Sequence, residues 1–131
     1  MLASKRSELL TAFAQGRVDP ASFSHRDHVR VSYELLAQRR FPEALLHLAR
    51  GLRRLAAKAG KPEIYHETMT AAFLALIAER SLGKPCASWE EFEERNPDLF
   101  RKDLLERFYR PDVLQSALAR QTFVLPGSTA S

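Results

Sequence analysis

Three of the four histidines in this chain stand in a pattern that could support metal or acid–base chemistry. His25 and His28 are three residues apart, and His66 follows later in the chain. A neutral imidazole nitrogen is a good ligand for zinc and for iron. The ring can also donate or accept a hydrogen bond, and it gains or loses a proton near neutral pH. Whether the three side chains act together depends on the elements that carry them.

The helical periodicity of the sequence places these histidines on the inward faces of two helices. At about 100° per residue, His25 and His28 fall within the apolar stripe of a helix expected over residues 24–39. His66 falls on the apolar stripe of a helix expected over residues 63–82. The loops that follow the second and third helices are short, so the second and fourth helices should run parallel. All three histidines are therefore expected at one end of the bundle.

This placement predicts a metal site. His25 and His28 lie one turn apart, and with His66 on a facing helix they could present three ring nitrogens to one zinc or iron ion. The positive ends of the helix dipoles favour neutral rings, as a metal ligand requires. Three neutral ligands would leave a coordination position for water or for a substrate.

Two further side chains are candidate catalytic residues. Glu63 stands three residues before His66, a spacing used in carboxylate metal bundles, so it could complete the metal site or orient His66. It is equally an ordinary acidic first-turn residue of a helix that starts at Pro62. Thr70 shares the face of His66 and could hold a metal-bound water or a substrate oxygen, or it could bond back to the carbonyl four residues earlier.

Glycine and proline separate periodic segments and indicate an all-α fold. Helices are expected, in chain order, over residues 4–15, 24–39, 42–59, 63–82, 88–94, 99–109 and 111–119. Capping boxes at Ser24 and Ser88 open two of them, and Asn96 is expected to cap a third. We predict one domain over residues 1–131, an up-and-down bundle of four main helices with shorter C-terminal helices packed over it. Residues 121–131 are expected to form a tail.

Composition excludes several classes of protein. The 131 residues are 45% hydrophobic and 27% charged, which is typical of an ordinary globular domain. The single cysteine, Cys86, allows no intrachain disulfide, and no apolar run approaches the roughly 18 residues that a membrane span requires. No secretory signal is visible, so we expect a cytoplasmic protein with no membrane partner.

The basic residues suggest one alternative surface. The net charge is only +4, and most basic side chains are interspersed with acidic ones. The third helix carries a denser group, formed by Arg50, Arg53, Arg54 and Lys58 with His47 among them. We interpret this group mainly as a solvated helix face, so nucleic acid is not an expected partner. The leucine seam of the same helix is compatible with a homodimer.

Two motifs resemble those of a known family. Phe23-Ser-His-Arg-Asp-His and Tyr65-His-Glu-Thr-Met-Thr, together with Asn96-Pro97 and the segment ending at Pro126, resemble a largely uncharacterised family of small bacterial all-helical proteins with F-x-H-x-x-H and Y-H-x-T-x-T motifs. The resemblance covers residues 23–126. It implies motif positions at His25, His28, His66, Thr68 and Thr70, but it implies no particular reaction.

The sequence therefore favours a small metal-dependent enzyme that acts on a small molecule at His25, His28 and His66. Zinc would suggest hydrolysis or hydration, and iron would suggest oxygen chemistry. A metal-free binding module, in which the same inward polar groups hold a small ligand, is the first alternative. An interaction protein that uses the basic third helix is the second.

Overall fold

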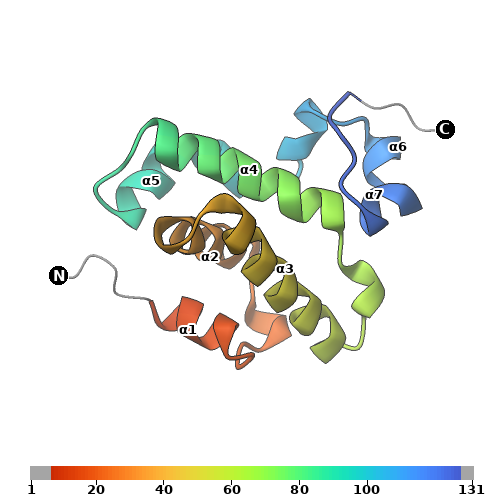
Figure 1. Cartoon of the computed structure of the whole chain (residues 1–131), viewed down its shortest axis with the longest axis horizontal. Helices are drawn as coiled ribbons and strands as arrows, with labels where there is room; N and C mark the ends of the chain where they lie inside the picture. Colours follow the sequence, from red (N-terminus) through yellow and green to blue (C-terminus); the bar gives the residue numbers. More distant parts are fainter. Residues whose placement is uncertain (1–6, 128–131) are drawn as a thin grey trace.

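Residues 7–127 are described by a computed structural model, and the regular structure within this range is entirely helical (Figure 1). The α-helices are α1 (Glu8–Ala14), α2 (His25–Gln38), α3 (Phe41–Lys58), α4 (Glu67–Gly83), α5 (Trp89–Arg95), α6 (Pro111–Leu114) and α7 (Ala117–Gln121). Four 3₁₀ turns accompany them: η1 (Pro20–Ser22), η2 (Pro62–Ile64), η3 (Pro97–Phe100) and η4 (Leu104–Arg107). The predicted all-α fold class is confirmed. None of the helices in this range combines the length and apolarity needed to cross a membrane.

The centre of the bundle is formed by α2, α3 and α4, each of which packs against the other two. Figure 1 shows α4 running across α2 and α3, with α1 on their opposite side and α6 and α7 near the amino end of α4. The largest fully buried side chains include Phe92, Leu10, Leu48, Leu74, Ile77, Leu99, Leu105, Val29 and Val31. Burial of these apolar side chains from every part of the chain supplies the main driving force for the bundle.

The start of α2 has the predicted capping box. The Ser24 Oγ accepts the Asp27 N–H at 3.1 Å, and the Asp27 carboxylate accepts the Ser24 N–H at 3.1 Å. At α5, Ser88 likewise accepts the Glu91 N–H, but the Glu91 carboxylate accepts the N–H of Ala87 rather than that of Ser88. Both helix starts are therefore where the sequence predicts them.

The start of α4 differs from the prediction of one helix from residue 63. The chain forms η2, then an extended segment at Tyr65 and His66, and α4 begins only at Glu67. The reason is that the His66 side chain caps α4 by accepting the Met69 N–H at 3.1 Å. An N-cap residue needs extended dihedral angles, and His66 has φ −135° and ψ 108°. Glu63 and His66 consequently do not share a helix.

The helix predicted over residues 99–109 is absent from the described structure, which has η3 and η4 there. Asn96, its expected cap, makes other bonds: its side-chain oxygen accepts from Arg80, and its amide donates to the Phe92 carbonyl. Arg80 also pairs with Asp98 through two bonds of 2.9 Å. These long-range contacts hold the segment in short turns. The helix predicted over 111–119 is likewise divided, into α6 and α7.

The predicted tail is ordered against the bundle as far as the structure describes it. The Thr68 hydroxyl of α4 donates to the Thr122 carbonyl at 2.7 Å and accepts the Val124 N–H at 3.0 Å. Tyr109 donates to the Val124 carbonyl at 2.7 Å, and Val124 is buried. The remainder of the predicted tail, residues 128–131, and residues 4–6 of the first predicted helix lie outside the described residues.

The basic side chains of α3 are exposed, as predicted, and several also make contacts within the molecule. Arg54 donates to the Ala14 carbonyl at 3.2 Å. Lys58 donates to the Val18 carbonyl at 3.0 Å. These bonds tie the carboxyl half of α3 to the end of α1 and to the loop that follows α1. The basic side chains therefore help to hold α1 and this loop in place.

Candidate ligand-binding pocket

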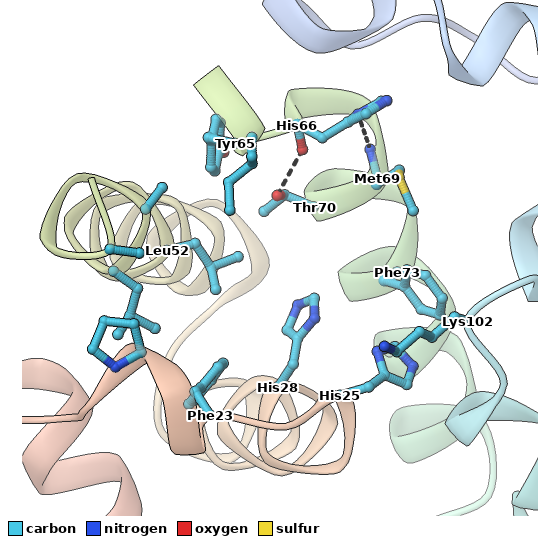
Figure 2. Close-up of a pocket in the computed structure, with 15 residues that line it drawn as sticks. Phe23, His25, His28, Leu52, Tyr65, His66, Met69, Thr70, Phe73 and Lys102 are labelled. Carbon is cyan, nitrogen blue, oxygen red and sulfur yellow. Dashed lines mark hydrogen bonds between the residues drawn. The ribbon is translucent and has the colours of Figure 1, made fainter. Parts of the chain in front are cut away.

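A pocket of about 390 Å³ lies where the amino ends of α2 and α4 meet the carboxyl half of α3 (Figure 2). It is lined by Pro20, Phe23, His25, His28, Leu52, Leu55, Ala56, Ala59, Ile64, Tyr65, His66, Met69, Thr70, Phe73 and Lys102. The prediction that His25, His28 and His66 gather at one end of the bundle is thus confirmed. Most of the wall is aliphatic or aromatic, and no carboxylate from residues 7–127 belongs to this lining.

His66 is the most constrained of the three histidines. Its Nδ1 accepts the Met69 N–H, which requires a lone pair on that nitrogen. Its Nε2 therefore carries the proton and donates it to the Leu114 carbonyl at 2.6 Å. The side chain is buried, and its residue is 8% exposed. Both ring nitrogens of His66 are consequently used within the fold, in a neutral ring of defined tautomer.

His25 has one nitrogen committed to the fold. Its Nε2 donates to the Leu99 carbonyl at 3.0 Å, a bond that spans 74 residues of sequence. The ring packs edge-on against Phe73 and His28, with centroid distances of 5.1 Å and 5.8 Å. Burial lowers the pKa of His25, the bond to Leu99 opposes this, and the charge of Lys102 adds to the lowering.

His28 presents an unpaired polar atom to the pocket. Its Nε2 is buried and has no hydrogen-bond partner within residues 7–127. Figure 2 shows the His28 ring pointing into the space between α2, α3 and α4. Burial, with a smaller effect from His25, lowers the pKa of His28 to about 4, so the ring is neutral at pH 7. An unsatisfied buried polar atom costs about 1–3 kcal/mol, and a ligand group in the pocket would remove that cost.

The three histidines are not arranged as a set of metal ligands in the described structure. No group of three or more His, Cys, Asp or Glu side chains in residues 7–127 is placed to hold a metal ion. The physical reason is the capping role of His66, because a nitrogen engaged in a hydrogen bond cannot also bind a metal. At most His25 and His28 have a nitrogen to offer, which is fewer than the three protein ligands typical of catalytic zinc. Binding of zinc or iron itself stays a prediction.

Glu63 lies outside the pocket that the histidines line, and its predicted role beside them stays a prediction. It belongs to η2, its side chain is exposed, and it borders a different hollow, which contains Arg120. The Arg120 guanidinium donates to the Glu63 and Ile64 carbonyls at 3.4 Å and 3.3 Å. Arg120 thus holds η2 against α7.

Thr70 and Tyr65 line the pocket with hydroxyl groups that are already engaged. Thr70 donates to the His66 carbonyl at 2.8 Å, which is the backbone bond considered as the alternative to a catalytic role. Tyr65 donates to Glu67 at 2.9 Å, and the Arg53 guanidinium lies 4.8 Å from its ring centroid. Burial raises the pKa of Tyr65 to about 12; the contact with Thr70 opposes this and that with Glu67 adds to it. Neither hydroxyl is poised to act as a base.

Lys102 is the pocket residue that sequence reasoning missed. It lies between η3 and η4, and among the described residues it is the only charged side chain in the lining. Figure 2 shows it beside Phe73 and His25. No local motif could have identified it, because its position depends on the irregular fold of the segment that the sequence predicts to be helical.

Comparisons with family models, curated proteins and solved structures find no match to this chain. The resemblance drawn from the two histidine motifs therefore stays a prediction. The functional argument rests on the geometry of the pocket and on the chemistry of the residues that line it.

Proposed function

We propose that this protein binds a small, largely apolar molecule in the pocket between α2, α3 and α4, and that His28 hydrogen-bonds to a polar group of that molecule. The observation that carries this proposal is the buried, unpaired Nε2 of His28 at an otherwise mostly apolar wall. Native proteins satisfy nearly all of their buried polar atoms, so an orphaned one at a cavity is a strong indication of a ligand contact.

The size and composition of the pocket support the same function. A volume of about 390 Å³ falls within the range of roughly 300–1,000 Å³ found for small-molecule sites. Such sites derive most of their affinity from apolar walls and most of their specificity from a few polar groups. Here Leu52, Leu55 and Phe73 belong to the apolar wall, and His28 provides a polar group among them.

Binding without a metal requires less change to the fold than the metal-dependent enzyme favoured by the sequence. Coordination by His66 would break its bond to the Met69 N–H or its bond to the Leu114 carbonyl. Breaking either would leave a buried backbone group without a partner, at a cost of about 1–3 kcal/mol. A ligand that contacts His28 leaves both bonds intact.

The proposal is tested with octan-1-ol, a neutral probe that has an apolar chain and one hydroxyl. We expect saturable changes in the ¹H–¹⁵N spectrum of the full chain that centre on the starts of α2 and α4. A His28→Leu substitution keeps the apolar contact but removes the hydrogen bond, and it should weaken binding about two- to tenfold.

Two tryptophan variants locate the site. Ala59 is exposed at the end of α3 and lines the pocket, so Ala59→Trp should fill the opening and abolish binding. Ala57 is also exposed on α3 but does not line the pocket, so Ala57→Trp should bind normally. Equal binding by both variants would place the probe elsewhere, and no saturable binding by the wild type would contradict the proposal.

A metal analysis distinguishes the enzyme hypothesis. The protein, purified without a histidine tag, is equilibrated with zinc or iron(II), dialysed and analysed for its metal content beside His66→Ala and His47→Ala. We expect less than one bound ion per chain. One zinc or iron per chain, lost in His66→Ala and kept in His47→Ala, would replace the proposed function with a metal-dependent one.

A further inference from the structure

The charge around the pocket is unbalanced. Lys102 is the only charged residue in the lining, and within residues 7–127 its ammonium has no hydrogen-bond or ion-pair partner. Two of the carboxylates near it in sequence are engaged elsewhere. Asp103 pairs with Arg101 at 3.1 Å, and Asp98 pairs with Arg80 at 2.9 Å. Among residues 7–127, the pocket lining therefore has one cation at its edge and no carboxylate to balance it.

His25 and His28 lie on the same side of the pocket as this cation, whereas the hydroxyls of Tyr65 and Thr70 are bonded within the fold. Lys102 and His25 are close enough for the charge of one to affect the protonation of the other, and His25 packs edge-on against His28. The unpaired Nε2 of His28 faces the pocket beside them. The opposite wall, formed by Leu52, Leu55 and Ala56 of α3, is apolar. A molecule that matches both sides would have a polar head and an apolar body.

The two helix starts favour a negative head. The amino ends of α2 and α4 both border the pocket, and a helix start carries a partial positive charge. The first-turn carboxylates of these helices are already engaged. Asp27 is bound within the capping box, and Glu67 contacts Arg53 and Tyr65. Within residues 7–127 neither carboxylate belongs to the pocket lining, so neither would contact an anion bound there.

We infer that the natural ligand is a small amphipathic carboxylate, whose carboxylate group pairs with Lys102 and hydrogen-bonds to His28 while its apolar body packs on α3. This inference rests on the proposed function, because it names the class of molecule that the same pocket takes. An ammonium at the edge of an apolar cavity attracts a carboxylate at close range and at low ionic strength. A neutral ligand would gain nothing from that charge.

The experiment compares octanoate with octan-1-ol, which have the same number of carbon atoms and differ in the charge of the head. Both are titrated into the full chain at pH 7 in low salt and again in 0.5 M NaCl. We expect octanoate to bind about fivefold more tightly in low salt, the upper limit for a solvent-accessible ion pair. The advantage should largely disappear in 0.5 M NaCl, where charges are screened over a few ångströms.

Two charge variants assign the effect to one side chain. Lys102→Gln should bind octanoate no more tightly than octan-1-ol. Lys84→Gln removes the same charge from an exposed residue at the carboxyl end of α4, outside the pocket, and should keep the preference for octanoate.

The outcomes separate this inference from the function on which it rests. Binding of octan-1-ol without a preference for octanoate would overturn the inference and leave the proposed function standing. A preference that survives in Lys102→Gln would also overturn it, because another group would then hold the carboxylate. If neither compound binds, the proposed function and the inference both fall.

Discussion

The amino ends of α2 and α4 border the same pocket, yet they use their histidines in opposite ways. At α2, the side chains of Ser24 and Asp27 accept each other's backbone N–H, and the Nε2 of His28 has no partner within residues 7–127. At α4 the cap is His66 itself, and its second nitrogen is bonded to Leu114. His28, at the start of α2, therefore has a nitrogen available to a ligand, whereas both ring nitrogens of His66, at the start of α4, are already bonded.

This difference shows that the position of a histidine does not by itself define its chemistry. Every helix start has backbone donors that need partners, and the side chain that satisfies them is lost to other tasks. A serine at the cap of α2 leaves the histidines of its first turns available for other bonds. A histidine at the cap of α4 becomes part of the scaffold. The following substitutions test that contrast.

The largest effect is expected from loss of the α4 cap. His66→Ala removes the partner of the Met69 N–H and that of the Leu114 carbonyl, so we expect a loss of about 2–4 kcal/mol in the free energy of unfolding. His28→Leu removes only an unpaired polar atom, so its free energy of unfolding should be unchanged within about 1 kcal/mol, or increased. Urea denaturation at pH 7 measures both. Equal losses in the two variants would contradict the contrast, and His66→Asn, which retains a capping oxygen, should recover part of the stability.

The next effect is a dependence of stability on pH. His28 has a pKa of about 4 in the folded protein, below the 6.5 of an unperturbed histidine, so the unfolded chain binds the proton more readily. Stability should therefore be lost as the pH falls from about 6.5 to 4, by up to about 3 kcal/mol. His25, whose pKa is also lowered, acts in the same direction. The urea midpoints at pH 7 and pH 4.5 should differ less in His28→Leu than in the wild type. An equal difference in the two proteins would show that His28 is not the source of the pH dependence.

A smaller effect is expected at the start of α2. Ser24→Ala removes the side-chain acceptor for the Asp27 N–H and should lower the free energy of unfolding by about 1 kcal/mol, a typical value for an exposed N-cap. Ser24→Asp keeps an acceptor and should cost less. Thermal denaturation of the two variants beside His66→Ala gives the ranking. A Ser24→Ala protein that is less stable than His66→Ala would contradict the expectation that the cap of α4 contributes more to stability than the cap of α2.

The smallest effect is expected for Lys102→Gln. Since Lys102 is exposed and has no partner in the described structure, this substitution should change the free energy of unfolding by less than about 0.5 kcal/mol. Urea denaturation without ligand measures it. A larger loss would show that Lys102 supports the fold, and its effect on octanoate binding would then need a structural explanation.

The features that the sequence predicts well are those determined by near neighbours in the chain. The capping box of α2 links residues three apart, and the inward face of His28 follows from helical periodicity. The gathering of the histidines follows from short connections between helices. Each of these confirmed predictions uses only local spacing and simple topology.

The features that the sequence does not predict depend on distant partners. The second bond of His66, from its Nε2, is to the distant Leu114, and the helix expected after Asn96 is prevented because Arg80 binds Asn96 and Asp98. The position of Lys102 follows from the turns that replace that helix. A single sequence carries no local sign of these pairings. The predicted metal centre therefore consists of histidines that do lie close in space, but some of their ring nitrogens are bonded to backbone groups.

The bonds of His66 and Thr68 also have a consequence for the order of synthesis. The pocket wall from residues 20 to 73 is made early, but the partners of these two side chains, Leu114 and Thr122, are 48 and 54 residues further along the chain. On the ribosome, the His66 Nε2 and the Thr68 hydroxyl lack these partners until residues 114 and 122 have been made. The pocket therefore matures only after these residues have been synthesised, and a nascent chain cannot offer a finished pocket to a ligand before that point.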